Sequence, residues 1–334
     1  MRLDRPPAGR LYHGVYPGTP GGEEDDVAIG DVRAYEALAG QRVAWVYFSH
    51  NWYHGHRFPF RTARVIRALG AVPFIRLMLR SSPEVYLAEP RYTLEAILQG
   101  QFDADLVAWA RDARAFGTPL LVEYGTECNG EWFPWNGVWN GGLRRGPQRF
   151  VAAYRHIVRT MRQAGAANLT WVFHVAWEDD PAEPWNALER YYPGDDAVDW
   201  LAVSAYGAQT PQDESIETFR AAMDAVYPRL TALTPAKPIM VAEFGCTAGH
   251  PGVSPSRWAR AALRALFAHR WPQVAGFSWW NERWQNDEDP AHDSDMRLQD
   301  LPALAQTFHT MLAGHADVLQ TSPCITRCPF SKSA

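Results

Sequence analysis

Two glutamates follow short apolar segments, and their placement is the strongest chemical signal in the sequence. Residues 119–122 (PLLV) lead through Glu123 to Glu127, and residues 238–242 (PIMVA) run directly into Glu243. Two carboxyl groups that face each other across a cleft can cleave a glycosidic bond, because one protonates the departing oxygen while the other attacks the sugar or activates water. Glu127 and Glu243 are therefore the candidate catalytic pair.

Aromatic side chains crowd the segment after Glu127. Residues 131–142 (EWFPWNGVWNGG) hold three tryptophans among glycines and asparagines, a composition that cannot build its own core and is long for a simple connection. Flat rings with a polar edge suit the stacking of sugar rings. The segment predicts one wall of an open groove, with Trp132 close to the catalytic pair and Trp135 or Trp139 further out. For Trp139, packing against a neighbouring loop is an equal alternative.

The rest of the chain must position these residues, and it alternates short apolar runs with longer amphipathic ones. The apolar runs have strand length and are rich in Val, Ile, Phe and Trp, as strands buried on both faces should be; they are residues 12–16, 43–48, 72–79, 119–124, 169–175, 200–204, 238–244 and 274–280. Eight such units predict a single-domain (β/α)₈ TIM barrel over residues 1–316, with a loosely ordered tail at 317–334. An open doubly wound sheet is the alternative, but no glycine fingerprint for a nucleotide follows the first run.

Three helices have recognisable limits. Pro147 is expected at a first helical position, with apolar residues recurring at spacings of three and four until Gly165. Ser215 is expected to cap a helix that carries Phe219 on its apolar face. A last helix over residues 301–312 closes the chain.

Active sites of (β/α)₈ barrels lie at the carboxyl ends of the strands, so residues at those ends form the remaining candidates. Polar and aromatic groups of the kind that contact sugars occur at nearly every predicted strand end. The candidates for substrate contact are His50, Trp52, Arg76, Asn129, His174, Tyr206, Trp279 and Trp280, together with Trp132 and Trp135.

The two glutamate motifs carry a family resemblance. A glutamate that leads into Asn-Gly-x-Trp-Phe-x-Trp after the fourth strand, and Ala-Glu-Phe-Gly at the end of the seventh, resemble glycoside hydrolase family 26, a family of retaining (β/α)₈ enzymes. The resemblance implies that Glu127 is the acid/base and Glu243 the nucleophile. It also implies that Tyr206 donates a hydrogen bond to the nucleophile, and that Trp279 or Trp280 forms the floor beside the scissile bond.

The sequence departs from the family pattern at two positions before the acid/base. The family usually shows Arg-Pro-x-His-Glu, whereas this chain has Glu123 in place of the arginine and Thr126 in place of the histidine. We expect Glu123 to support the site by pairing with Arg76, and it is the reserve candidate for the acid. The substrate is not inherited across such a difference, although β-mannan and β-glucan are the expected classes.

Composition excludes several other classes of protein. The chain has 334 residues, a formal charge of −5 and no run of Lys or Arg, so it lacks the basic face that nucleic acids need. No stretch of about 18 apolar residues is present, which argues against a membrane partner. The first ten residues lack the apolar run of a signal peptide, which is typical of a cytoplasmic protein; a secreted chain trimmed of its leader would look the same, so localisation stays open.

Metal ligands and reactive thiols are not expected. His50, His54 and His56 belong to a loop without the glutamate and helix of a metalloprotease site, and the acidic residues 287–295 lack the alternation of a calcium loop. Cys128 and Cys246 are interpreted as small buried residues, and Cys324 and Cys328 as a tail pair.

The combined prediction is a retaining glycosidase that cleaves a β-linked polysaccharide or oligosaccharide by double displacement, with no cofactor or metal. A carbohydrate-binding protein on a hydrolase barrel, with the chemistry lost, is the alternative because Thr126 replaces the expected histidine.

Overall fold

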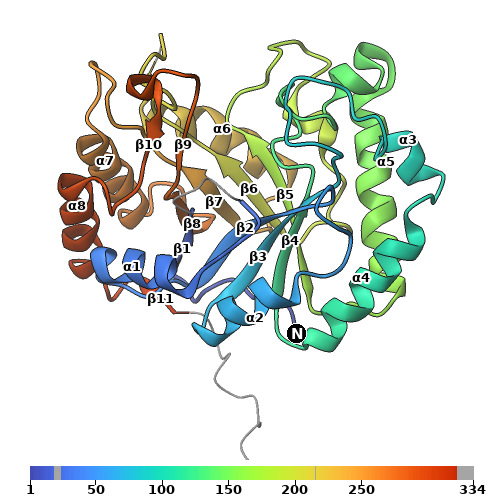
Figure 1. Cartoon of the computed structure of the whole chain (residues 1–334), viewed down its shortest axis with the longest axis horizontal. Coiled ribbons are helices and arrows are strands. Elements are labelled where there is room, and N and C mark those ends of the chain that lie inside the picture. Colours follow the sequence, from blue (N-terminus) through green and yellow to red (C-terminus); the bar gives the residue numbers. More distant parts are fainter. Residues whose placement is uncertain (19–23, 215, 322–334) are drawn as a thin grey trace, which may run out of the picture.

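Eight parallel strands close into a barrel (Figure 1). The computed structural model describes residues 1–18, 24–214 and 216–321. The strands pair in sequence order, and β1 pairs with β8 to complete the circle. They are β1 (Leu11–Tyr16), β2 (Trp45–Asn51), β3 (Val72–Met78), β4 (Leu120–Tyr124), β5 (Leu169–Ala176), β6 (Trp200–Ser204), β7 (Ile239–Phe244) and β8 (Val274–Trp280). The predicted (β/α)₈ barrel is confirmed, with all eight strands within a few residues of their expected limits.

Helices surround this barrel and connect its strands (Figure 1). They are α1 (Ile29–Ala39), α2 (Phe60–Ala68), α3 (Leu94–Leu98), α4 (Asp103–Phe116), α5 (Gly142–Gln163), α6 (Phe219–Leu233), α7 (Pro255–Phe267) and α8 (Pro302–Ala313). The fifth connection differs from the expected regular alternation, since between β5 and β6 only a short 3₁₀ helix, η2 (Leu188–Tyr191), is present. Three prolines in residues 177–199 explain this, because each removes a backbone donor and restricts the residue before it.

Two predicted helix starts were wrong and one helix was predicted closely. Helix α5 begins at Gly142, so Pro147 lies inside its first turns rather than at its first position. Helix α6 begins at Phe219, where the Thr218 hydroxyl accepts a hydrogen bond from the Ala221 amide; Ser215 lies outside the described residues. Helix α8 covers the expected range.

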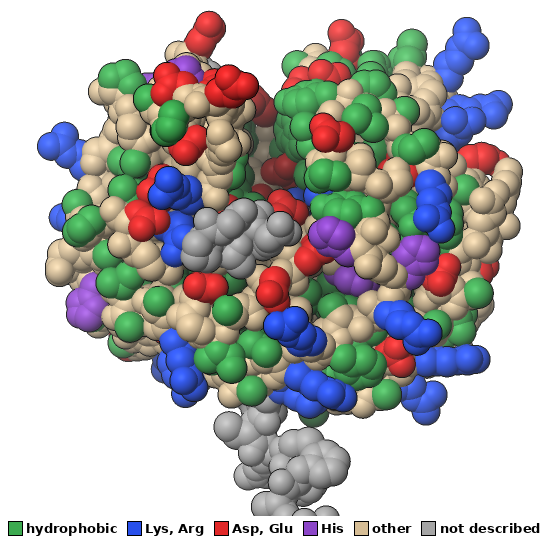
Figure 2. Space-filling view, in the orientation of Figure 1, with side chains coloured by type: hydrophobic (Ala, Val, Ile, Leu, Met, Phe, Trp, Pro, Cys, Tyr) green, Lys and Arg blue, Asp and Glu red, His purple; other side chains and the backbone are tan. Residues whose placement is uncertain are grey.

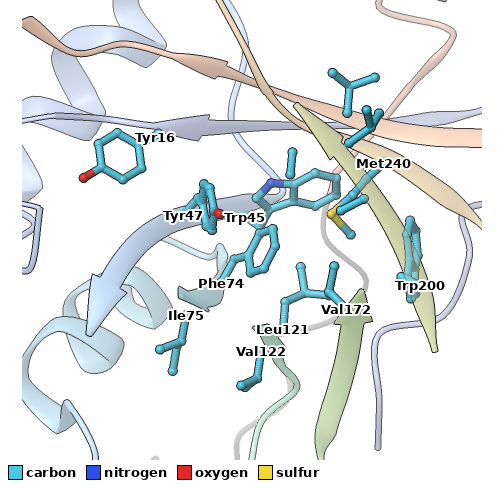
Figure 3. Packing of buried hydrophobic residues seen from close by; sticks show 14 of the residues in the cluster. Tyr16, Trp45, Tyr47, Phe74, Ile75, Leu121, Val122, Val172, Trp200 and Met240 are labelled. Atoms are coloured by element: carbon cyan, nitrogen blue, oxygen red, sulfur yellow. The ribbon is translucent and has the colours of Figure 1, made fainter. Parts of the chain in front are cut away.

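The indole of Trp45 occupies a central place in the apolar part of the barrel interior (Figure 3). Trp45 is fully buried, and its Nε1 donates to Ser278 Oγ at 2.5 Å. A Cβ at Gly14 or Gly276 would come within 2.1 or 2.3 Å of this ring, so both neighbouring strands have glycine where they face it. Figure 3 shows Trp45 among apolar side chains that include Phe74, with Tyr47 beside it.

The described chain continues beyond residue 316 as a short strand. Strand β11 (Leu319–Gln320) pairs in parallel with the start of β1, through Leu11 and Tyr12. Residues 322–334, which include Cys324 and Cys328, lie outside the described residues. None of the described helices is long and apolar enough to cross a membrane.

Candidate active site

Glu243 lies in the mouth of the barrel, next to the last residue of β7. Its side chain is almost fully buried, and two tyrosines contact its carboxylate: Tyr206 donates to Oε2 at 2.9 Å, and the Tyr47 hydroxyl lies 3.1 Å from Oε1. The pairing of β7 with β6 and with β8 shifts register here, and such irregularities re-aim side chains near active sites. The backbone therefore directs this carboxylate into the barrel, where hydroxyl donors hold both of its oxygens.

The environment of Glu243 favours its protonated form. Burial raises its pKa to about 7; the Arg76 guanidinium, whose Nε lies 3.9 Å from Oε1, opposes this rise, and the negative charge of Glu127 adds to it. The charge of Glu127 therefore acts on Glu243, in the same direction as burial.

Glu127 occupies the loop directly after β4, in an uncommon backbone conformation. Its φ angle is 48°, in the left-handed region that residues other than glycine rarely adopt. Trp132 Nε1 donates to its Oε2 at 2.8 Å. The Trp132 ring lies over Gly130, where an added Cβ would come within 2.2 Å of it, so the glycine of the Asn-Gly motif allows the tryptophan to reach the carboxylate.

A second buried carboxylate, Glu123, is the centre of a hydrogen-bonded cluster beneath the site. It receives hydrogen bonds from Tyr47 and Thr126 on Oε1, and from His174 Nδ1 on Oε2 at 2.8 Å. Arg76 Nε lies 3.8 Å from Oε1, which confirms the expected pairing of these two residues.

In this cluster the negative charge of Glu123 is paired with the positive charge of His174. Burial opposes ionisation of Glu123, but the charge and hydrogen bond of His174, aided by Arg76, outweigh it and hold the pKa of Glu123 below its usual range. Burial likewise opposes the charged form of His174, yet Glu123 raises the pKa of the imidazole. Both residues are therefore held in their charged forms as a buried ion pair.

The two candidate tryptophans on β8 have different surroundings. Trp280 lies beside the residues that contact Glu243. The centroid of its ring is 5.5 Å from the guanidinium carbon of Arg76 and 6.5 Å from the ring centroid of Tyr206. Its ring also stacks on that of Tyr16, with 3.7 Å between the two centroids. Trp279 is fully buried on the other side of the strand, against Phe244. Of the two, Trp280 is the one whose ring lies near Arg76 and Tyr206, which both contact Glu243.

Other residues expected to contact substrate are buried in structural contacts. Trp135 donates to the Thr126 carbonyl, and Trp52 packs on Tyr92 and Phe102. His174 is fully buried between Glu123 and Ser204. These side chains support the loops and strands around the site, and their aromatic or polar character alone did not reveal this.

Asn129 and His50 also have structural surroundings. The Asn129 amide donates to the Ala176 and Glu178 carbonyls and accepts from the Ala176 amide, so it ties the loop after β4 to the end of β5. His50 is almost fully buried near the ring of Trp109 on α4.

A hollow open to solvent adjoins Tyr206. It measures about 230 Å³ and is bordered by Trp177, Tyr206 and several acidic side chains, among them Glu178 and Asp213. Figure 2 shows a furrow between two raised parts of the surface, with acidic side chains at its base. The outline is that of a cleft rather than an enclosed pocket.

Sequence reasoning missed Tyr47, and it noted Ser204 only as one of the residues at the end of the sixth strand. Tyr47 lies two residues after Trp45 on β2, so strand alternation places both side chains in the barrel interior, and a hydroxyl there needs a partner. Ser204 is the last residue of β6, and its hydroxyl forms a hydrogen bond of 2.8 Å with His174 Nε2. The period of two along these strands was the signal that could have found both.

Metal ligation has no support among the described residues, where no group of three or more His, Cys, Asp or Glu side chains is arranged to hold an ion. His54 contacts Asp25, and His56 contacts Tyr92. Cys128 and Cys246 are buried and free, as predicted.

The chain thus combines a parallel (β/α)₈ barrel with one candidate carboxylate in the loop after β4 and another on β7. The family model for glycosyl hydrolase family 26 matches residues 91–246 of this chain, and this range includes both glutamates. Together with the relatives below, this match shows that the chain is similar to proteins of glycosyl hydrolase family 26.

Similar proteins act on several β-linked glycans according to their names. Endoglucanase H of Acetivibrio thermocellus is 26% identical over 258 residues, covering 77% of this chain and 27% of the relative. The β-1,3-xylanase TXYA of a Vibrio species is 29% identical over 117 residues, covering 35% of this chain and 23% of that protein. The chain thus spans about a quarter of the length of these curated relatives.

Solved structures with the same fold include mannanases. A family GH26 β-mannanase from Bacteroides ovatus superposes with a TM-score of 0.64 at 16% identity, covering 98% of this chain and 95% of that one. An endo-β-1,4-mannanase of Cellulomonas fimi has a TM-score of 0.64 at 20% identity, with coverage of 96% and 74%. At these identities the likeness concerns the fold.

Proposed function

We propose that this protein is a retaining glycoside hydrolase that cleaves β-linked polysaccharides or oligosaccharides. The observation that carries the proposal is the Glu243 carboxylate, held at the barrel mouth by Tyr206 and Tyr47 and close enough to Glu127 for their charges to interact. Two carboxyl groups with different surroundings are what acid/base and nucleophilic roles require.

In the proposed reaction Glu243 attacks the anomeric carbon while Glu127 gives its proton to the departing oxygen. The glycosyl ester neutralises Glu243, and Glu127 then takes a proton from the water that releases the sugar. Tyr206 and Tyr47 position the nucleophile through their hydroxyl groups. Trp132 donates a hydrogen bond to Glu127, and its ring is only partly buried, so that it remains available to stack on a sugar.

The substrate classes that we propose are β-mannan and β-glucan. The mannanases share the fold, and the relative named endoglucanase aligns over most of this chain. A substrate screen should therefore compare β-mannan, mixed-linkage β-glucan and β-1,3-xylan, with the anomer first released followed by NMR. Initial release of the inverted anomer would rule out double displacement.

The roles of the two glutamates separate in a rescue experiment. Glu127→Ala and Glu243→Ala should both abolish polysaccharide cleavage, but only the Glu127 variant should still form the covalent intermediate from an aryl glycoside with a good leaving group. Azide should restore its turnover and yield a β-glycosyl azide, because a small anion attacks without a general base. Glu123→Ala is the matched comparison for the reserve acid: if it loses polysaccharide cleavage while Glu127→Ala keeps full activity, Glu123 is the acid/base and Glu127 is not.

Tight oligosaccharide binding with no turnover of any aryl β-glycoside or polysaccharide would instead establish a binding protein.

A further inference from the structure

The Tyr47 hydroxyl lies between two carboxylates. It is hydrogen-bonded to Glu123 Oε1, and it lies 3.1 Å from Glu243 Oε1. A phenolic hydroxyl carries one hydrogen, so it donates to only one of these oxygens at a time. All three side chains are buried, so each carboxylate depends on fixed protein donors.

The two carboxylates do not need this hydrogen equally. Glu123 also receives hydrogen bonds from Thr126 and His174. Glu243 receives one from Tyr206 on Oε2, while its Oε1 has Tyr47 and the more distant Arg76 Nε at 3.9 Å. Tyr47 is thus the closest donor to one oxygen of the nucleophile, and Glu123 competes for it.

The hydroxyl keeps its hydrogen throughout. Burial raises the pKa of Tyr47 well above its ordinary value, and the charges of Glu123 and Glu243 raise it further. A rotation about the bond between the ring and the oxygen is therefore enough to move the donor from one carboxylate to the other, with no covalent bond formed or broken.

We propose that Tyr47 is a shared donor that turns between Glu243 and Glu123, and that Glu123 acts through it as a positioning residue that sets the basicity of the nucleophile. The inference rests on the proposed function, because it assigns a role in preparing that nucleophile. Competition from Glu123 leaves Glu243 less stabilised as an anion and hence a stronger base. When Glu243 becomes an ester, the hydroxyl turns to Glu123, so neither state leaves a buried donor unpaired.

Several titratable groups face Glu243, and the test must separate them from the shared hydroxyl. They are Tyr16 on β1, Tyr47 on β2, Arg76 on β3, Glu123 on β4, Glu127 in the following loop, His174 on β5 and Tyr206 after β6. Removing the Glu123 charge lowers the pKa of Glu243 through space alone. A pathway through Tyr47 adds a second contribution that exists only while the hydroxyl is present.

The experiment is a titration of Glu243 by NMR in protein labelled with ¹³C at the glutamate carboxyl carbons, with Glu243→Gln identifying the signal. Glu123→Gln should lower the pKa of Glu243 by about one unit, because Tyr47 then donates to Glu243 full-time and the competing charge is gone. In a Tyr47→Phe background the same substitution should produce less than about half of that shift, since only the charge effect remains. Tyr206→Phe is the matched control: it removes the other tyrosine donor, and there Glu123→Gln should keep its full effect. Equal shifts in all three backgrounds would overturn the proposal.

A second variant changes the competition in the opposite direction. Thr126→Val keeps the shape of the side chain but removes a donor to Glu123, which then draws the Tyr47 hydrogen more often. The pKa of Glu243 should rise, and an unchanged or lowered value would contradict the shared donor even if Glu123→Gln does not fold.

The titration needs no substrate, so the two proposals fail separately. Coupling through Tyr47 in a protein that hydrolyses no glycan would refute the proposed function and support the shared donor. Hydrolysis with equal shifts in all backgrounds would do the reverse. In an active enzyme, the acidic limb of the kcat/KM profile should move with the NMR value, whereas a merely structural Glu123 would leave the limb in place.

Discussion

The two ends of the barrel interior are made by the same strands but differ in chemistry. On β2, Trp45 lies at the apolar end and Tyr47 follows two residues later at the site; on β4, Leu121 precedes Glu123 in the same way. Two residues along a strand amount to about 6.6 Å, so the interior changes from close-packed to hydrogen-bonded over a very short distance.

The difference separates what stabilises the fold from what the proposed chemistry requires. Around Trp45, apolar side chains are closely packed, and two glycines leave the room that the indole ring needs. Around Glu243, an acid with a raised pKa and the ion pair of Glu123 and His174 are buried, at a cost in solvation. We expect substitutions at the first end to lower stability and substitutions at the second to change activity and pH dependence.

The largest effect on stability is expected at Trp45. Trp45→Ala should lower the free energy of unfolding by about 3–5 kcal/mol, because the neighbouring glycines cannot fill the cavity. Urea denaturation measures the change, and Trp45→Phe, which keeps an aromatic ring, should lose less. A loss below about 1 kcal/mol would show that the site can collapse and that the apolar end is not close-packed.

Glu243→Gln should make the protein more stable at alkaline pH. The native carboxyl, whose pKa of about 7 is well above the ordinary glutamate value of 4.5, holds its proton more tightly than the unfolded chain does. Its contribution to stability is therefore complete below pH 4.5 and is lost as the pH rises through about 7. At pH 8 the variant should gain about 3 kcal/mol over the wild type, relative to the difference between them at pH 4. Urea midpoints at both pH values measure this gain; a difference independent of pH would contradict the burial of a titrating group here.

Two tryptophans of one loop should respond differently. Trp132→Ala should lower kcat/KM on oligosaccharides by a factor that corresponds to roughly 1–3 kcal/mol, with little change in melting temperature, because its ring is partly exposed beside Glu127. Trp135→Ala should instead lower the melting temperature, because this side chain is only 2% exposed. If Trp132→Ala unfolds the protein or leaves every oligosaccharide hydrolysed as before, the loop does not form the groove wall.

The smallest effect is expected at the edge of the polar end. Ser204→Ala removes the partner of His174 Nε2 and should destabilise the protein by about 1 kcal/mol, while His174 keeps its ion pair with Glu123. Thermal unfolding measures the change. Thr234→Ser serves as a control, because it substitutes another buried residue but keeps its hydroxyl, and its stability should stay close to that of the wild type. No measurable change would indicate that His174 finds another partner.

The sequence predicted the barrel well because strands buried on both faces produce apolar runs that are hard to mistake. It places Glu127 and Glu243 near the ends of two strands because each carboxylate follows such a run, and their catalytic roles stay a prediction. It did not predict which aromatic rings are accessible. Trp132 and Trp135 lie in one loop, and only the fold determines that one ring covers Gly130 and the other turns to the Thr126 carbonyl.

The roles of the polar residues under the site were equally hard to predict. His174 has the residue type of a ligand-binding group, yet its surroundings make it the partner of Glu123. Tyr47 was overlooked because a tyrosine in an apolar strand is normally interpreted as a core residue. Only the structure shows that its hydroxyl lies between two carboxylates, Glu123 on β4 and Glu243 on β7. Contacts between strands far apart in sequence decide such roles, and no local pattern contains them.

The slot around Trp45 has an evolutionary consequence. Because the ring occupies the space that a Cβ at Gly14 or Gly276 would need, these three positions on β2, β1 and β8 cannot vary one at a time. A homologue with a smaller residue at position 45 should carry larger ones opposite it, and an intermediate that changes only one position would be either overfilled or hollow. Ancestral lineages that crossed between the two arrangements would have needed stability in reserve, so this trio should be inherited as a block.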